Sequence, residues 1–318
     1  MKLIELGKTG VEVSALCLGT MYFGSRENEN ESYQLLNQYY EAGGTFLDTA
    51  NIYSFWLPEF KGGESESLLG KWMKECKNRS DLFIASKVGL AYQNIKAGLR
   101  ACQIETECEK SLKRLGVETI DLYYAHIDDR NTPIEETMGA FHRLHKAGKI
   151  RFIGASNFMS WRMENAHWVS QKNGWIDYCC IQQRYSYIRP NPGGLFTPQL
   201  VVNEELKDYC YNKGLALLAY SPLLNGAYTR SDRHFPPQYL GPDTNERLKV
   251  LKAIATEVDS TVNQVIYAWM IQNNPPIIPL MAASTSFQMQ KNLRSLEVKL
   301  SDDQVVRLNE ANTGGTAW

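Results

Sequence analysis

The chain has 318 residues, 43% of them hydrophobic, and its 34 basic and 35 acidic residues leave a formal net charge of -1. This apolar content supports a sizeable core and excludes a largely disordered chain. The balanced charge, with no basic cluster, argues against a nucleic-acid partner, and we expect no membrane association because there is no run of about 18 apolar residues.

Strand-like and helix-like segments alternate along the whole chain. Two short runs joined by the turn sequence GKTG, at 2–6 and 11–13, predict an N-terminal β-hairpin. Eight apolar runs that predict strands follow, near residues 15–18, 45–47, 82–86, 120–124, 150–155, 176–181, 215–219 and 276–279. Helical patterns lie between them, among them 31–42, 65–76, 104–115, 134–147, 159–172, 204–212, 246–257 and 287–296. Because each strand is continuously apolar, we expect both of its faces to be buried, as in a parallel sheet.

This alternation predicts an α/β fold, a (β/α)8 TIM barrel, as a single domain over residues 1–318. A doubly wound sheet is the alternative, but it usually has a GxGxxG turn after its first strand, and the chain contains none. Three long segments, at 54–63, 186–202 and 221–245, follow predicted strands. We therefore expect them on the C-terminal face of the barrel, where their aromatic residues and prolines would form pocket walls.

Seven cysteines occur at irregular spacing and without a CxxC pair. The pattern favours reduced thiols in a cytoplasmic protein over a disulfide framework or a zinc site, and we expect no metal. The N-terminal segment MKLIELGKTG has no long apolar stretch and does not read as a secretory signal.

Four residues stand at or just past the ends of predicted strands: Asp48 and Tyr53 in FLDTANIYS, Lys87 in FIASKVG and His126 in IDLYYAHIDD. In a barrel such ends converge on one face, so the four side chains are expected to meet there. Each alone is as readily explained by capping, packing or solvation. Together, a carboxylate, a phenol, an ammonium and an imidazole indicate controlled proton transfer.

Tyr53 is the expected general acid. An ammonium at about 4 Å would favour its phenolate by about 4 kcal/mol and move its pKa from about 10 toward neutrality, where an acid–base catalyst works best. We expect Lys87 to supply this charge, Asp48 to keep Lys87 charged, and a neutral His126 to orient a substrate carbonyl.

These motifs resemble those of the aldo-keto reductase family, and the resemblance extends from the hairpin to about residue 312. DTANIY resembles the family segment DTAxxY, SKVG resembles its lysine strand, and DLYYAH resembles DLYxxH. The resemblance implies a (β/α)8 barrel that transfers a hydride between nicotinamide C4 and the carbonyl or alcohol carbon of an aldehyde or ketone, with Tyr53 as general acid and base.

Further segments resemble the family's site for NADP(H) or NAD(H). In GASNF, Ser156 and Asn157 would bind the nicotinamide carboxamide together with Gln182 of IQQRYS. In AYSPL, Tyr220 would stack on the nicotinamide ring. Its neighbours Ser221 and Leu223 would approach the pyrophosphate.

The adenosine end departs from the family. Asn292 in QKNL matches the asparagine that contacts adenine, but Ser284 stands where the family usually has an arginine that binds the 2′-phosphate of NADPH. Ser284 and its neighbours can hydrogen-bond a phosphate or a bare ribose, and Lys291 or Arg294 is an alternative phosphate ligand. Loss of one charge-assisted contact weakens NADPH preference by about tenfold or more, so we expect relaxed or NADH-leaning specificity.

The substrate is expected to be a small carbonyl compound or alcohol. Polar and aromatic residues expected at the mouth favour a sugar, a polyol or a glycoside: Tyr22, Trp56, Tyr92, Arg130, Arg184, Arg189 and Tyr228. Two other functions stay open. One is a cofactor-binding regulatory or interaction protein of the same fold, as in potassium-channel β subunits. The other is a barrel enzyme in which Lys87 forms a Schiff base. The sequence indicates no oligomeric state.

Overall fold

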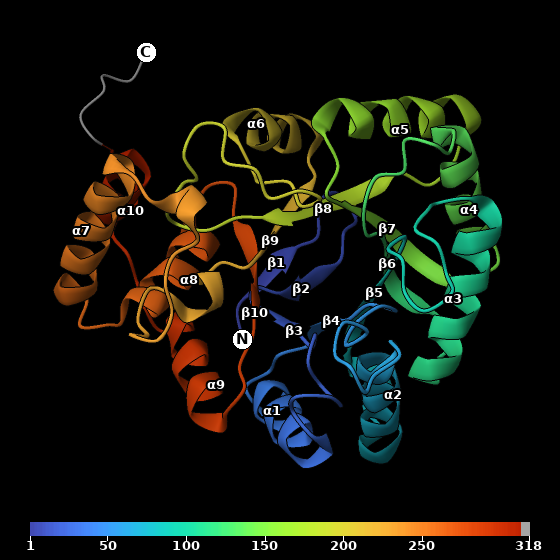
Figure 1. Ribbon diagram of the computed structural model, residues 1–318, viewed down its shortest axis with the longest axis horizontal. Coiled ribbons are helices and arrows are strands. Elements are labelled where there is room, and N and C mark those ends of the chain that lie inside the picture. Colours follow the sequence, from blue (N-terminus) through green and yellow to red (C-terminus); the bar gives the residue numbers. More distant parts are fainter. Residues whose placement is uncertain (313–318) are drawn as a thin grey trace.

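Eight parallel strands close into a barrel with helices around it (Figure 1). The structure is a computed structural model and describes residues 1–312. The barrel strands are β3 (Cys17–Gly19), β4 (Phe46–Asp48), β5 (Phe83–Val88), β6 (Ile120–Ala125), β7 (Ile150–Ser156), β8 (Tyr178–Arg184), β9 (Ala216–Tyr220) and β10 (Ile277–Met281). They follow one another in chain order, and β10 pairs with β3 to close the ring. The predicted (β/α)8 barrel is confirmed.

Helices follow the strands and pack outside the barrel (Figure 1). They are α1 (Glu29–Glu41), α2 (Glu64–Cys76), α3 (Ala101–Leu115), α4 (Ile134–Lys146), α5 (Ser160–Asn173), α6 (Glu204–Lys213), α7 (Pro242–Glu257), α8 (Val262–Gln272), α9 (Ser286–Leu293) and α10 (Asp302–Glu310). The structure adds α8 and α10 to the expected helices. In α8, residues 264–271 are all buried, so its sequence lacks the polar face that marks an amphipathic helix.

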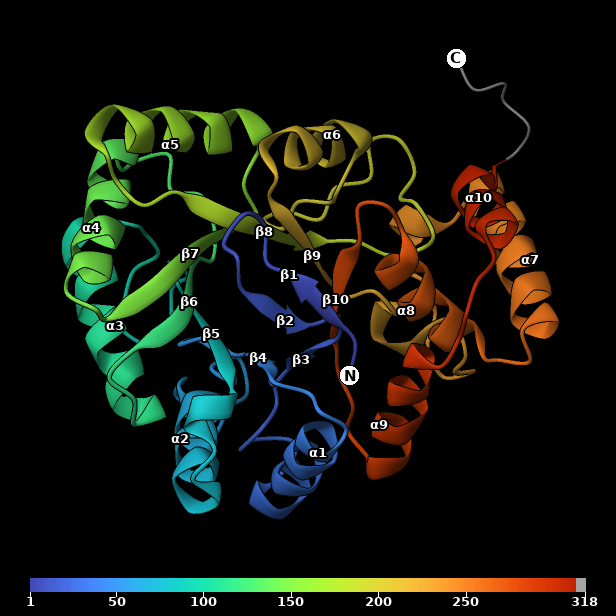
Figure 2. The same cartoon turned by 180° about the vertical axis from the view of Figure 1, so that it is seen from behind.

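The predicted N-terminal hairpin is present as β1 (Leu3–Glu5) and β2 (Glu12–Ser14), which pair in antiparallel fashion. It lies across one end of the barrel (Figure 2). Val13 of β2 and Leu6, directly after β1, are fully buried in the same apolar cluster as Phe46 and Leu122 of the barrel strands. The hairpin therefore closes the N-terminal end of the barrel and leaves the opposite end for the site.

Strand register decides which polar side chains face one another. Asp48 is the last residue of β4 and pairs with Ala85, and Lys87 pairs with Tyr124 of the next strand. β5 runs to Val88, further than expected, so Lys87 lies inside a strand rather than beyond its end. A rigid strand thus carries the ammonium group.

Among residues 1–312, no helix combines the length and the apolar character that crossing a bilayer requires. The same residues contain no group of three or more His, Cys, Asp or Glu side chains arranged to hold a metal ion. Residues 313–318 of the predicted domain lie outside the described residues, so a single domain over 1–318 stays a prediction.

Candidate active site

A buried hydrogen-bond network joins three of the four expected catalytic residues. The ammonium group of Lys87 donates to Asp48 Oδ1, to the carbonyl oxygen of Thr49 at 2.9 Å and to Tyr53 Oη at 2.8 Å. Lys87 and Asp48 are both 0% exposed. An ammonium group has three N–H donors, and all three are engaged, as a buried charge requires. Because all three N–H groups of Lys87 are engaged in the interior, its nitrogen has no free position toward a substrate and is poorly placed to form a Schiff base.

The phenol of Tyr53 lies on the turn that follows β4. Its backbone N–H donates to Ala50 O at 3.2 Å, and its side chain is buried. Tyr53 Oη also donates to Asp48 Oδ1 at 3.3 Å, longer than a usual hydroxyl–carboxylate bond of about 2.7 Å. The hydrogen bond from the phenol to Asp48 is therefore weak, and the phenolic O–H is available to another acceptor.

The pKa of Tyr53 differs from the sequence-based expectation. Burial, and next the negative charge of Asp48, raise the pKa of the Tyr53 phenol well above its usual value. The expected fall in the pKa came from the cation of Lys87 alone. In the structure, desolvation and the Asp48 carboxylate have the larger effects on the pKa of Tyr53. Tyr53 is consequently a protonated phenol at neutral pH, which suits a proton donor.

His126 lies directly after β6, beside the phenol. Its backbone N–H donates to Val88 O at 2.8 Å, and its ring meets that of Tyr53 edge-on with 6.3 Å between centroids. Burial and then the Lys87 charge lower the pKa of His126 well below its usual value, so the imidazole is neutral. Its Nδ1 is buried and has no hydrogen-bond partner among the described residues.

Gln182 of β8 lies closer to the catalytic group than the sequence suggested. Its Nε2 donates to Asp48 Oδ2 at 2.8 Å. The carboxylate of Asp48 therefore accepts bonds from an ammonium group, a phenol and an amide. The amide oxygen of Gln182 is still available for a ligand, because only its nitrogen takes part in this bond.

A second network lies at the ends of β7 and β9. Asn157 Nδ2 donates to Ser156 Oγ at 3.0 Å and to His126 O at 3.1 Å, while Tyr220 Oη donates to Asn157 Oδ1 at 2.8 Å. Asn157 has a φ of 57°, a left-handed conformation that asparagine tolerates better than most residues. These contacts place an amide, a hydroxyl and an aromatic ring beside His126.

Ser221 and Leu223 follow Tyr220 in the loop after β9. Ser221 has a φ of 56°, and its carbonyl oxygen accepts a bond from Leu224 N at 3.1 Å, which folds the loop back sharply. Both residues are partly buried. The loop leaves the barrel beside Tyr220, so its position is compatible with the expected contact to the pyrophosphate.

The expected adenosine residues lie around the start of α9. Ser284 is exposed in the loop after β10, and its backbone N–H donates to Gln288 Oε1 at 2.9 Å. Asn292 is buried, and its Nδ2 donates a hydrogen bond to Ala282 O at 3.0 Å. Lys291 Nζ lies 4.4 Å from the centroid of the Phe287 ring. Asn292 thus shapes the loop that carries Ser284.

Glu27 is a polar residue that the sequence did not single out at this place. It lies in the loop after β3, where burial raises the pKa of its carboxyl group, while the Ser284 hydroxyl is near enough to lower that pKa. Closure of the barrel makes β3 the neighbour of β10, which brings the two loops together. Within the polar run SRENENES nothing distinguishes this glutamate from its solvated neighbours.

The described residues fit a nicotinamide dinucleotide in their chemistry. Gln182 offers an amide oxygen that matches a carboxamide, and the Tyr220 ring offers a face for a flat heterocycle. The Asn157 amide is already engaged by His126 O, Ser156 Oγ, Tyr220 Oη and Leu200 N. His126 Nδ1, after β6, and Glu27 Oε2, after β3, both lack a hydrogen-bond partner among the described residues. Other buried atoms of the described residues also lack partners, so these two support a bound molecule only together with their position at the rim.

An aromatic wall borders the catalytic phenol. The Trp56 ring is 43% exposed and packs edge-on against Tyr53 and Tyr22, with centroids 6.3 and 6.2 Å away. The arginines expected at the mouth are engaged elsewhere: Arg130 with Asp128, Arg184 with Tyr239 and Gln199, and Arg189 with Asn309 O. Tyr92 and Tyr228 are likewise bonded, to Glu107 and to Ile188 N.

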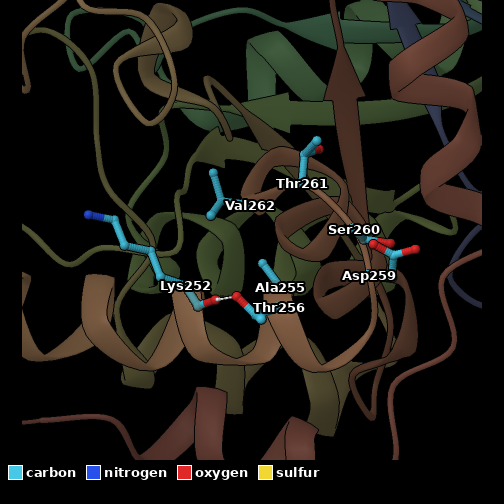
Figure 3. A pocket seen from close by; sticks show the side chains of 7 residues that line it. All are labelled: Lys252, Ala255, Thr256, Asp259, Ser260, Thr261 and Val262. Carbon is cyan, nitrogen blue, oxygen red and sulfur yellow. Dashed lines mark hydrogen bonds between the residues drawn. The ribbon is translucent and has the colours of Figure 1, made fainter.

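A separate surface hollow lies between the end of α7 and the start of α8 (Figure 3). It is lined by Lys252, Ala255, Thr256, Asp259, Ser260, Thr261 and Val262. None of the residues of the networks described above lines it, so we assign it no part in the site.

Comparison with known proteins gives a consistent result. The model of the Aldo/keto reductase family matches residues 15–313. Norsolorinic acid reductase stcV of Emericella nidulans is 30% identical over 95% of this chain and 79% of its own length. Aldo-keto reductase yakc [NADP(+)] of Schizosaccharomyces pombe is 30% identical over 93% of this chain and 86% of its own. A solved structure, the thermostable aldo-keto reductase Tm1743 in complex with the inhibitor epalrestat, superposes with a TM-score of 0.78 at 30% identity and covers 98% of this chain and 100% of its own.

Proposed function

The chain belongs to the aldo/keto reductase family and is an NAD(P)H-dependent oxidoreductase, and we propose that Tyr53 is its general acid and base. In the proposed reaction a hydride moves between nicotinamide C4 and the carbonyl or alcohol carbon of an aldehyde or ketone. The observation that carries the proposal is the buried contact of Tyr53 Oη with Lys87 Nζ at 2.8 Å, at the open end of the barrel.

The proposed roles follow from the network. During reduction Tyr53 donates its proton to the substrate oxygen, and Lys87 stabilises the phenolate that remains, because its ammonium group already donates to that oxygen. Asp48 keeps Lys87 charged and oriented. His126, neutral and edge-on to the phenol, orients the same carbonyl by hydrogen bonding. For the reverse oxidation, the Tyr53 phenolate accepts the proton of the alcohol.

We place the cofactor along the rim formed by the ends of β7, β8, β9 and β10. Reduced nicotinamide supplies the hydride when bound. Ser156 and Gln182 would hold its carboxamide, joined by Asn157 once it exchanges one of its present hydrogen bonds, and Tyr220 would support its ring. Ser221 and Leu223 would border the pyrophosphate, and Asn292 would face the adenine. Ser284 in place of an arginine favours NAD(H) over NADP(H).

For the substrate, the structure favours a carbonyl on a flat aromatic group over a sugar. Trp56, partly exposed beside Tyr53, offers a ring face or edge to an aryl group. The sugar or polyol expected from the sequence needs free polar side chains at the mouth, and Arg130, Arg184 and Arg189 already have partners. One relative is named aryl-alcohol dehydrogenase, and another is named norsolorinic acid reductase.

A substrate screen tests this function. The purified protein is mixed with aryl aldehydes, aryl ketones, aldoses and short aliphatic aldehydes, and oxidation of NADH or of NADPH is followed by absorbance. The corresponding alcohols test the reverse direction. We expect the highest kcat/KM with an aryl carbonyl. Turnover of aldoses above all aryl compounds would contradict the proposed substrate, and no turnover of any carbonyl would contradict the function.

A further inference from the structure

Glu27 is a buried acid with an unsatisfied oxygen. Its side chain is 7% exposed, and Oε2 has no hydrogen-bond partner among the described residues. Burial raises the pKa of Glu27, while the nearby Ser284 hydroxyl and the charge of Arg26 act in the opposite direction. A buried carboxyl oxygen that lacks a donor is unfavourable, and in native structures such an atom calls for an explanation.

The backbone holds Glu27 firmly at this place. Glu27 O accepts bonds from Gly24 N at 2.9 Å and Ser32 Oγ at 3.0 Å, and Glu27 N donates to Tyr22 O at 3.2 Å. Helix α1, which begins two residues later, packs beside α9 (Figures 1 and 2). The carboxyl group is therefore fixed next to the loop that carries Ser284, across the junction between the first and last strands of the barrel.

No ion pair joins Glu27 to a cation among the described residues, although the charge of Arg26 is near enough to oppose the rise that burial causes in its pKa. The guanidinium of Arg26 lies over the ring of Tyr22 at 4.3 Å from its centroid, and Lys291 lies over the ring of Phe287. Ser284 itself carries no charge. The position at which a 2′-phosphate would be expected is thus bordered by a hydroxyl and a carboxylate, a pair that suits ribose hydroxyl groups and repels a phosphate dianion.

Building on the proposed function, we propose that Glu27 accepts a hydrogen bond from a hydroxyl group of the adenosine ribose and selects NAD(H) against NADP(H). The hydroxyl group supplies the donor that the carboxyl group lacks. The same chemistry serves dinucleotide-binding sheets, in which an acidic residue on the ribose 2′-hydroxyl marks a preference for NAD. A 2′-phosphate would bring a second anion against the Glu27 carboxylate.

Equilibrium binding tests this selection without any catalytic readout. Wild type, Glu27→Gln and Glu27→Ala are titrated with NADH and, separately, with NADPH, and the quenching of protein fluorescence gives each Kd. We expect wild type to bind NADH more tightly than NADPH. In both variants we expect NADPH to bind about tenfold more tightly than in wild type, as loss of one repulsive charge would produce, and NADH to bind more weakly. Glu29→Gln is the matched control, because it removes a charge from the exposed start of α1 and should leave both Kd values unchanged.

A second substitution sharpens the test. Ser284→Arg should increase NADPH affinity more when Glu27 is already replaced by Gln, because in wild type the new guanidinium would pair with the carboxylate instead of the phosphate. If wild type binds NADH and the ratio of the two Kd values is the same in wild type, Glu27→Gln and Glu27→Ala, the inference about Glu27 is overturned and the proposed function stands. If wild type binds neither cofactor, both are overturned.

Discussion

Lys87 Nζ donates a hydrogen bond to Tyr53 Oη across 2.8 Å, and both groups are buried at the end of a closed barrel. Because the ammonium group donates to the phenol oxygen, the phenol keeps its own proton for another acceptor. Asp48 Oδ1 at 3.3 Å is a distant acceptor for it. A carbonyl oxygen arriving between Tyr53 and His126 would offer a better one.

Replacing Lys87 should destabilise the fold as well as abolish activity. Lys87→Met leaves Asp48 charged, 0% exposed and without its cation, which costs about 3–5 kcal/mol of unfolding free energy. Adding Asp48→Asn should restore part of this loss, because the uncompensated charge is then gone. Urea denaturation measures both. Lys71→Met, at an exposed ion pair with Glu29, serves as the control. Equal stabilities of Lys87→Met and Lys71→Met would show that the buried pair does not contribute as described.

His126 should make stability depend on pH in the acidic range. The folded protein holds the imidazole neutral, since burial and then Lys87 lower its pKa, whereas the unfolded chain takes up a proton near pH 6.5. Below about pH 6.5 the unfolded state therefore binds more protons, and the unfolding free energy falls by up to about 1.4 kcal/mol per pH unit from this group.

The variant His126→Gln should lose that part of the slope, as measured by urea denaturation at pH values between about 5 and 6.5. His234→Gln, at an exposed histidine, should keep it. Identical slopes for wild type and His126→Gln would mean that the imidazole titrates in the folded protein much as it does in the unfolded chain.

Trp56 should matter for aryl substrates alone. Trp56→Ala removes the partly exposed ring beside Tyr53, and an aromatic pair of this kind is worth about 0.5–1.5 kcal/mol. We expect KM for an aryl aldehyde to rise by up to about tenfold and KM for a short aliphatic aldehyde to stay unchanged. Trp168→Ala, at an exposed ring on α5, is the matched control. A similar rise for both substrate classes would remove the argument for an aryl group.

Much of the fold and the grouping of the catalytic residues were open to prediction from the sequence. Continuously apolar strands in alternation with helices predict the barrel, and their C-terminal ends predict that Asp48, Tyr53 and Lys87 meet. The balance of charges inside the site was harder to predict from the sequence. The expected drop in the pKa of Tyr53 considered one neighbour, whereas the observed rise reflects burial and Asp48, which depend on packing.

Contacts between residues that are far apart in the chain could also not be predicted from the sequence. Gln182 and Asp48 are separated by 134 residues yet share a 2.8 Å hydrogen bond. Glu27 lies near Ser284 because β3 and β10 are neighbours in the closed ring. Nothing in either local sequence indicates these pairs, since the first joins strands that face each other across the barrel and the second depends on the closure of the ring between β3 and β10.

The proposed mechanism depends on the phenolic proton of Tyr53, and the variant Tyr53→Phe tests this role most directly. The variant keeps the ring and removes the oxygen that contacts Lys87. In a single-turnover experiment with bound reduced cofactor and the best carbonyl of the screen, we expect the rate of cofactor oxidation to fall by about 10²-fold or more. Cofactor Kd, measured by fluorescence quenching, should stay within about threefold of the wild-type value. A variant that binds cofactor normally and retains most of the wild-type rate would contradict the assignment of Tyr53 as the proton donor.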